Sequence, residues 1–296
     1  MMWVRTDRRL ILNSSSVSPA IAPGAGNLPK LTLLAPDRAQ AEIYLYGAHV
    51  TSWIPAGGAE RLFLSRRSQF STGAPIRGGI PVVFPQFGMM GPLPLHGLAR
   101  LMAWELVSAE VVGTSARAIL RLGDTDDRWR LWANPFHAEL TVAVGGTQLA
   151  VTLAVSNTGT EAFSFTSGFH TYFAVTDLAA ASVENLAGLR YRDAAAGWTD
   201  HQQDTPRLGF DGEVNRIYFN APAELRLIEP TRTTRIQAAG FPDAVVWNPA
   251  AAKCATMTDM EPDDYQRFVC VEATAIVDPI RLAPGARWQG TQTLVA

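Results

Sequence analysis

Short apolar runs separated by glycine, proline, asparagine and aspartate make up the chain from about residue 31 onward. The clearest example is a pair of alternating segments, His137 to Val144 and Leu149 to Asn157, with Gly145-Gly146 between them. Alternation with a period of two on both sides of a glycine turn predicts a β-hairpin. Long helical periodicities are missing from the sequence. The pattern therefore predicts an all-β fold of many antiparallel strands.

The absence of sequence repeats limits the choice among all-β architectures. The sequence shows no repeat of 20 to 50 residues, which argues against a propeller or a solenoid. Residues 178–189 are compatible with either a short helix or a loop. A chain of 296 residues is long for one domain, but all-β sandwiches reach this size as a single unit. We therefore expect one large antiparallel β-sandwich.

The N-terminal region has a different composition from the rest of the chain. Residues 13–30 are rich in serine, proline, alanine and glycine and show no apolar periodicity. Such a segment is typical of a tail or a wrapping extension. The sequence predicts an N-terminal extension over residues 1–30 and a single β-sandwich domain over residues 31–296.

Charge and composition mainly exclude classes of protein. The formal net charge is −2 with 18% charged residues, which gives no electrostatic footprint for a nucleic acid. No run of about 18 apolar residues is present, so we expect no membrane span. Arg5, Arg8 and Arg9 precede only three apolar residues, too few for a secretory signal. We expect a cytoplasmic protein.

The two cysteines, Cys254 and Cys270, change little in this picture. They are too few for a disulfide framework, and their spacing matches no zinc signature. We expect reduced thiols, a site without a metal ion, and no cofactor.

The segment PIRGGIPVVFPQFG, residues 75–88, is a candidate for a loop that lines a cleft. It holds too much glycine and proline for a central strand and too few polar residues for a solvated loop. Arg77 precedes Gly78-Gly79, where backbone can approach a ligand closely and a guanidinium can reach over it. The alternative is a surface arginine beside a turn.

A histidine and an arginine follow in the segment LPLHGLAR, residues 93–100. His96 lies between Pro94 and Gly97, which constrain its backbone and so the direction of its imidazole. A histidine in such a place is often a structural hydrogen-bonding residue rather than a catalyst. Arg100, in an apolar setting, needs an anionic partner from the protein or from a ligand.

The aromatic segment FSFTSGFHTYF carries a second histidine. Alternation places His170 and Tyr172 on one face and Phe169, Thr171 and Phe173 on the other. One face then packs, and the other presents an imidazole and a phenol to a pocket. The alternative is a histidine bonded to a backbone carbonyl inside the sandwich.

Two acidic residues occur in apolar surroundings near the C-terminus. In FVCVEA, alternation puts Phe268, Cys270 and Glu272 on one face and the intervening valines on the other. Burying the Glu272 carboxylate is costly, so it is either paired structurally or used in acid/base chemistry. Asp243, after a proline and before an apolar run, is a candidate ligand or a turn-former.

These segments together resemble the aldose 1-epimerase family, and within it the hexose-6-phosphate mutarotase branch. The resemblance covers nearly the whole chain after about residue 30. It rests on five blocks that occur in the family's order and spacing: IRGGIPVVFPQFG, LPLHGLAR, FHTYF, VVWNP and FVCVEA.

The resemblance implies a β-sandwich of the galactose mutarotase type that interconverts the α and β anomers of an aldohexose 6-phosphate. Carried over by position, Glu272 would be the general base and His170 the general acid. His96 would bind near the ring oxygen or the anomeric hydroxyl. At neutral pH an unperturbed glutamate is ionised and a histidine is about half protonated, which fits these roles.

The resemblance also assigns substrate-binding residues. Asp243 would hold sugar hydroxyls, and Arg77 and Arg100 would hold the 6-phosphate. The family branch has a lysine directly after the Phe-Gly of the first block, where this chain has Met89. The partner implied is a small sugar or sugar phosphate, and we expect a monomer.

Three other functions are open at this stage. The chain could be a mutarotase for unphosphorylated aldoses, because Met89 weakens the case for phosphate. A glycoside hydrolase would use Asp243 and Glu272 as its two carboxylates, but leaves both histidines without a role. A carbohydrate-binding protein without activity would use tryptophans and polar side chains on the same sandwich.

Overall fold

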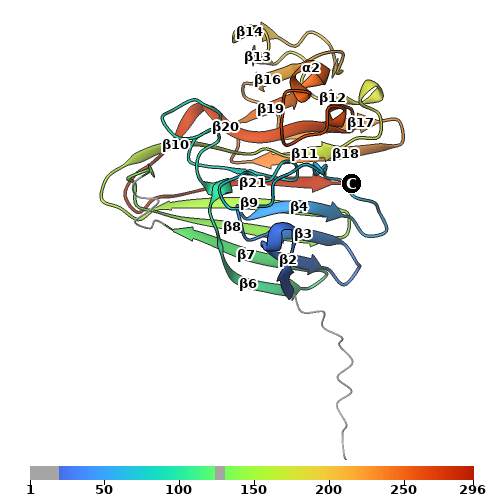
Figure 1. The fold of residues 1–296 in the computed structure, drawn as a ribbon. Coiled ribbons are helices and arrows are strands. Elements are labelled where there is room, and N and C mark those ends of the chain that lie inside the picture. Colours follow the sequence, from blue (N-terminus) through green and yellow to red (C-terminus); the bar gives the residue numbers. More distant parts are fainter. Residues whose placement is uncertain (1–19, 124–130) are drawn as a thin grey trace, which may run out of the picture.

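Antiparallel β-strands dominate the computed structural model, which describes residues 20–123 and 131–296 (Figure 1). In this part of the chain the strands form sheets of four, eight and nine members. The paired strands run antiparallel. The prediction of an all-β antiparallel sandwich is confirmed.

The nine-stranded sheet is the largest layer. Its strands, in spatial order, are β15 (Arg207–Leu208), β12 (Ser182–Glu184), β17 (Glu224–Glu229), β18 (Arg232–Ala239), β21 (Arg287–Val295), β9 (Gln148–Asn157), β8 (Phe136–Gly145), β7 (Ser115–Gly123) and β6 (Glu105–Val112). Strands β8 and β9 form the hairpin that the sequence predicted, with Gly145 opposite Gln148 at the turn.

The eight-stranded sheet forms the upper part of the molecule in Figure 1. Its strands, in spatial order, are β14 (Thr199–Gln202), β13 (Arg190–Asp193), β16 (Val214–Tyr218), β19 (Asp243–Asn248), β20 (Phe268–Leu282), β10 (Phe163–Phe169) and β5 (Val82–Val83), with β11 (Tyr172–Ala174) also pairing with β20. Strand β20 is central, because β19 pairs with one edge and β10 and β11 pair with the other.

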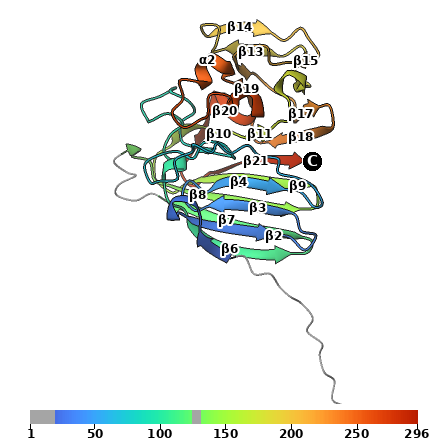
Figure 2. The same ribbon diagram turned by 45° about the vertical axis from the view of Figure 1, so that its right-hand side comes forward.

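The four-stranded sheet covers the opposite end of the nine-stranded sheet, where β2, β3 and β4 run across β7, β8 and β9 (Figure 2). Its strands are β1 (Ala20–Pro23), β2 (Pro29–Leu34), β3 (Gln40–Tyr44) and β4 (His49–Ile54).

The first paired residues precede Leu31, where the sequence analysis placed the start of the domain. Strand β1 pairs with β2, with Ile21 opposite Leu31. A strand of four exposed residues has no buried face, so it leaves no apolar periodicity in the sequence. Residues 1–19 of the expected extension lie outside the described residues.

The helical elements that lie within the described ranges are short. They are α2 (Ala250–Cys254) and the 3-10 turns η1 (Ala25–Asn27), η2 (Ala99–Leu101), η3 (Leu178–Ala180) and η4 (Asp264–Arg267). The segment that the sequence left open as helix or loop contains η3 followed by β12. No helix in the described ranges is long and apolar enough to cross a membrane.

One continuous core joins all three sheets. It contains Trp53 of the four-stranded sheet, Leu140 and Leu227 of the nine-stranded sheet, and Phe169 and Val271 of the eight-stranded sheet. A second cluster lies on the other face of the eight-stranded sheet and includes Tyr172, Trp247, Phe268 and Cys270. This second cluster packs beneath the candidate site.

Candidate active site

Strand β20 sends alternate side chains into the two clusters. Val269 and Val271 belong to the main core, whereas Phe268 and Cys270 belong to the second cluster. The predicted division of this strand into two faces is confirmed. Glu272 follows Cys270 on the second face and is only 2% exposed.

His170 lies between β10 and β11, where the chain leaves the regular ladder with β20. Its backbone N–H donates to the Pro81 carbonyl at 3.1 Å. Its ring stacks on Tyr172, with centroids 4.8 Å apart and an interplanar angle of 9°. Phe169 and Phe173 pack into the main core instead. The predicted faces of this segment are therefore confirmed.

These two strands bring His170 and Glu272 together. His170 Nδ1 lies 3.3 Å from Glu272 Oε1, and both residues are buried. Burial raises the pKa of Glu272 well above its usual value. Burial, followed by the charges of His96, Arg77 and Arg100, lowers the pKa of His170 well below its usual value. Both directions favour the uncharged forms of the two side chains, a protonated Glu272 and a neutral His170.

This ionisation is the reverse of the one expected from unperturbed groups. The sequence analysis assumed an ionised Glu272 and a protonated His170, because it could not weigh the desolvation of either side chain. The proton count of the pair is unchanged, since one proton is shared in both arrangements.

His96 is aimed at the same place by a constrained backbone. Its φ is +64°, in the left-handed region that few non-glycine residues adopt. The Gly88 N–H donates to His96 Nδ1 at 3.2 Å, so a neutral ring carries its proton on Nε2. Burial and the charges of Arg100 and Arg77 lower the pKa of His96 to about 3. His96 is therefore a neutral hydrogen-bond donor, and its ring centroid lies 5.2 Å from that of His170.

Arg77 is held in place by Asp259 and Tyr172. Its Nε and one terminal nitrogen both lie 3.0 Å from Asp259 Oδ2, and the other donates to the Tyr172 hydroxyl at 2.9 Å. Burial alone would lower the pKa of Arg77, but Tyr172 and Asp259 raise it overall, so the side chain stays charged. A side chain on Gly78 would place its Cβ 2.4 Å from the Phe63 carbonyl oxygen, so this loop needs glycine next to Arg77.

Arg100 is buried beside this network. One terminal nitrogen donates to the Leu95 carbonyl at 2.8 Å, whereas its Nε has no hydrogen-bond partner among the described residues. Burial lowers the pKa of Arg100 to about 10, so it is still a cation at neutral pH. Arg77 and Arg100 carry two positive charges, and Asp259 carries one negative charge. This group of side chains therefore has a net positive charge that favours the binding of an anion.

Asp243 does not face this arrangement. It begins β19, and its Oδ2 accepts hydrogen bonds from the backbone N–H groups of Ile276 at 3.0 Å and Val277 at 2.9 Å. Its Oδ1 accepts from the Asn220 N–H at 3.4 Å, and the residue is 3% exposed. These contacts connect Asp243 to β20 and to the Asn220 turn, and the assignment of Asp243 to sugar hydroxyls stays a prediction.

The histidines, Glu272 and Arg77 all line one cavity of about 400 Å³, a size found in small-molecule sites. Its wall is completed by Phe87, Gly88, Met89, Met90, Leu95, Trp198, Asn215, Ile217, Val245, Trp247, Lys253 and Met257. The sequence thus identified four residues of this cavity, while Arg100 lies behind it and Asp243 outside its lining.

The sequence analysis did not identify three residues of the site, namely Asp259, Lys253 and Trp198. Asp259 lies in an acidic run, TDMEPDDY, that resembles a solvated turn. Lys253 belongs to the short helix α2, and Trp198 to a turn, so neither has a periodic context. The distance in sequence between Asp259 and Arg77 leaves no local signal of their pairing.

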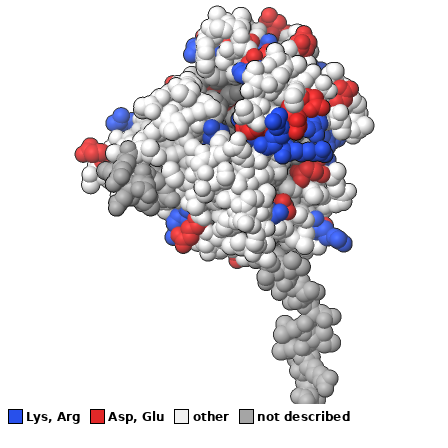
Figure 3. All heavy atoms as spheres, viewed as in Figure 1, with Lys and Arg blue, Asp and Glu red and all other residues white. Residues whose placement is uncertain are grey.

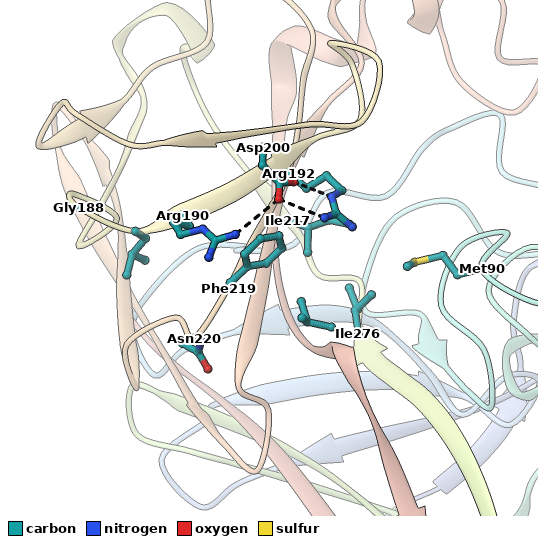
Figure 4. A pocket seen from close by; sticks show the side chains of 11 residues that line it. Met90, Gly188, Arg190, Arg192, Asp200, Ile217, Phe219, Asn220 and Ile276 are labelled. Carbon is teal, nitrogen blue, oxygen red and sulfur yellow. Dashed lines mark hydrogen bonds and ion pairs between the residues drawn. The ribbon is translucent and has the colours of Figure 1, made fainter.

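A second cavity of about 520 Å³ adjoins the first and shares Met90 and Ile217 with it (Figure 4). Arg192 on β13 donates to both carboxylate oxygens of Asp200 on β14, at 2.7 and 3.2 Å. The guanidinium of Arg192 also lies 5.6 Å from the centre of the Phe219 ring. These contacts brace the β13–β14 hairpin, whose strand residues line the second cavity.

The cavity floor contains a set of atoms that could hold a metal ion. One ligand atom each from His170, Cys270 and Glu272 lie within 4.8 Å of one another. Burial raises the pKa of the Cys270 thiol, as it does that of Glu272, so a metal would have to displace two tightly held protons. This protonation favours proton transfer over metal binding.

The outer surface carries charges of both signs. On the face shown in Figure 3, the largest group of basic side chains is flanked by acidic ones over the upper part of the molecule. On this face the basic side chains therefore lie among acidic ones and do not form a uniformly basic surface.

The fold and the site define a β-sandwich protein with a buried histidine–glutamate pair in the lining of a cavity of small-molecule size. The chain belongs to the aldose 1-epimerase family, whose model matches residues 29–295. This match confirms the resemblance on which the assignment of the site residues was based.

Relatives of known name support this membership. A protein of Cenchrus ciliaris named "Putative glucose-6-phosphate 1-epimerase" is 37% identical over 279 residues, covering 91% of this chain and 85% of that protein. A protein of the same name from Escherichia coli (strain K12) is 34% identical over 263 residues, covering 86% of each.

Solved structures agree with the fold. A "putative mutarotase (YeaD)" from Salmonella typhimurium superposes with a TM-score of 0.88 at 27% identity, covering 95% of this chain and 94% of the other. A galactose mutarotase-like protein from Lactobacillus casei ATCC 334 gives a TM-score of 0.72 at 16% identity, covering 89% of this chain and 98% of the other. The predicted galactose mutarotase type of sandwich is confirmed.

Proposed function

We propose that this protein is a hexose-6-phosphate mutarotase, an isomerase that interconverts the α and β anomers of an aldohexose 6-phosphate. The observation that carries the proposal is the buried pair of His170 and Glu272, whose Nδ1 and Oε1 atoms lie 3.3 Å apart in the lining of the cavity. Family membership and the names of the relatives support the same reaction.

The reaction needs one proton removed from the anomeric hydroxyl and one delivered to the ring oxygen. Glu272 accepts the first and His170 donates the second, so that the bond between C1 and the ring oxygen breaks and an open aldehyde forms. Hydroxyl groups that donate to Glu272 favour its carboxylate, and a nearby phosphate raises the pKa of His170. A bound substrate therefore moves the shared proton from Glu272 to His170, into the reactive arrangement.

The remaining steps need no further chemical group. Rotation about the bond between C1 and C2 exposes the other face of the carbonyl, and ring closure with the roles reversed gives the other anomer. His96 donates its Nε2–H to the ring oxygen or the anomeric oxygen and so keeps C1 beside the pair. Protons and electrons balance without an oxidant or a nucleotide.

The phosphate is proposed to bind at the arginine network. A guanidinium has five N–H donors, and the contacts with Asp259 and Tyr172 use three of those on Arg77, which leaves two for a ligand. Arg100 adds a second positive charge, with an Nε that makes no hydrogen bond in the described structure. Arg77 thus supplies hydrogen-bond donors for a phosphate, and Arg100 supplies additional positive charge behind it.

The test is the rate of anomer interconversion, measured by NMR exchange spectroscopy with glucose 6-phosphate and glucose in parallel. The wild type should accelerate the exchange of glucose 6-phosphate, and Glu272→Gln should lower this rate by about 10²- to 10⁴-fold. Glu110→Gln is the matched control, because Glu110 is exposed on the edge strand β6.

Other outcomes point to the alternatives. Acceleration of glucose alone would indicate a mutarotase for unphosphorylated aldoses, in agreement with Met89 in place of the lysine of the family branch. Binding of either sugar without acceleration would indicate a carbohydrate-binding protein. Wild-type activity in Glu272→Gln would contradict the proposed mechanism.

A further inference from the structure

Trp198 stands out among the side chains that line the cavity because it is large, apolar and exposed. Its exposed fraction is 55%, whereas Trp247 on the opposite wall is 8% exposed. Covering a large exposed indole with a ligand removes apolar surface from water and stabilises the complex, and Trp198 lies in the lining of the cavity where a ligand can do so.

The backbone at Trp198 is held in an unfavourable conformation. Its φ is +64°, and it follows Gly197, whose φ is +72°. Glycine adopts this region freely, but for a bulky side chain it is strained by about 1–3 kcal/mol. Such strain persists only where surrounding contacts impose it, and it is concentrated at functional sites.

Hydrogen bonds within the turn impose this conformation. The Trp198 N–H donates to the Asp193 carbonyl at 2.8 Å, and the Asp193 carboxylate accepts from the N–H groups of Ala195 at 3.0 Å and Ala196 at 3.2 Å. Arg216 binds the other carboxylate oxygen of Asp193 at 3.2 Å. The turn is thus fixed from within and from β16.

The hairpin that carries this turn is fixed as well. Residues 190–193 of β13 pair with residues 199–202 of β14 in continuous register. The Ala194 N–H donates to the Asn215 carbonyl at 2.8 Å, and Asn215 itself lines the catalytic cavity. The pairing of Arg192 with Asp200 braces the same hairpin one residue pair away from its turn end (Figure 4).

We propose that Trp198 is a sugar-binding residue whose indole packs against the C–H groups of the pyranose ring and holds the ring over His170 and Glu272. The inference rests on the proposed function and extends it, because it names the surface that positions the ring. Aromatic side chains offer large, rigid contact area to such a ligand and lose little conformational entropy.

The contact acts equally on the ground state and on ring opening, because it touches the ring carbons and not the atoms that exchange protons. Trp198→Ala should therefore raise KM for glucose 6-phosphate about tenfold and change kcat less than twofold. Trp198→Phe keeps an aromatic face and should stay within about threefold of the wild-type KM. Val111→Ala, an exposed apolar position on β6, is the control and should change neither constant.

Binding is measured separately by calorimetry with 1,5-anhydroglucitol 6-phosphate, which lacks the anomeric hydroxyl and cannot be turned over. Trp198→Ala should weaken its binding by the same tenfold factor and leave the unfolding midpoint in urea unchanged. Tryptophan fluorescence of the wild type should respond to the analogue, and this response should be smaller in Trp198→Phe, which still binds it.

The outcomes separate this inference from the proposed function. Tight binding by the wild type and equal binding by Trp198→Ala would overturn the role of Trp198 and leave the proposed function intact. A loss of stability in Trp198→Ala that matches its loss of binding would assign the side chain a structural role and overturn the inference. No binding of the analogue by the wild type would overturn both.

Discussion

Replacing Arg77 by alanine tests whether the arginine network holds a phosphate. The variant loses the two N–H donors that the Asp259 and Tyr172 contacts leave for a ligand. A hydrogen bond to a charged group contributes about 1.5–3 kcal/mol. We expect KM for glucose 6-phosphate to rise at least tenfold, which corresponds to about 1.4 kcal/mol.

The structure adds a second contribution to this effect. Asp259, whose side chain is 16% exposed, loses its cationic partner in Arg77→Ala and then faces the phosphate with a like charge. The double variant Arg77→Ala with Asp259→Asn removes this repulsion. It should recover part of the lost affinity, which would separate the direct loss of donors from the unpaired carboxylate.

The assay is the initial rate of anomer interconversion by NMR as a function of substrate concentration. Glucose, which lacks the phosphate, should show a KM within twofold of the wild-type value in the same variants. Arg117→Ala, an exposed arginine on β7, is the matched control. Unchanged KM values for glucose 6-phosphate in both Arg77→Ala and Arg100→Ala would refute the phosphate assignment.

Three further predictions concern ionisation, selectivity and stability. In the ligand-free protein His96 and His170 should stay neutral down to well below pH 6.5, because burial lowers the pKa of both, as NMR titration of their ring protons can show. Lys253→Ala should raise KM for glucose 6-phosphate about fivefold, and Glu213→Gln should lower it, because Glu213 binds the Lys253 ammonium at 2.5 Å and competes with the phosphate. Phe84→Ala should lower the free energy of unfolding in urea by about 3–5 kcal/mol, because the ring is fully buried among other aromatic rings.

A specific result would contradict each of these three predictions. A titration midpoint at or above pH 6.5 for either histidine would show that desolvation does not control the site. KM values for glucose 6-phosphate equal to that of the wild type in both Lys253→Ala and Glu213→Gln would contradict an interaction between Lys253 and the phosphate. A loss below about 1 kcal/mol in Phe84→Ala, compared with Val111→Ala as the exposed control, would contradict the packing of the core.

Local alternation predicted the parts of the site that lie on strands. The faces of β20 and of the segment around His170 follow from a period of two, and the structure places Glu272 and His170 on the faces expected. Glycine and proline neighbours marked Arg77 and His96, which lie in loops without periodicity, and the family blocks then assigned their roles. Both line the cavity.

Long-range and environmental effects could not be predicted in this way. Asp259 and Arg77 are far apart in the sequence, and only the fold brings them into contact. The local sequence around Asp243 is compatible with either a turn-former or a ligand, so it could not decide between them. The ionisation of Glu272 depends on how much water surrounds it, which a sequence pattern does not report. The sequence analysis did not predict strand β1, because an exposed edge strand has no apolar face.

The central position of β20 has a consequence for how this protein can evolve. A shift of one residue along this strand would exchange its two faces, turning Glu272 into the main core and a valine toward the cavity. Single insertions or deletions between Phe268 and Glu272 should therefore be eliminated by selection, whereas many substitutions there need only preserve volume. Lineages that diverge in substrate should vary the surrounding loops in length and keep this stretch at constant length.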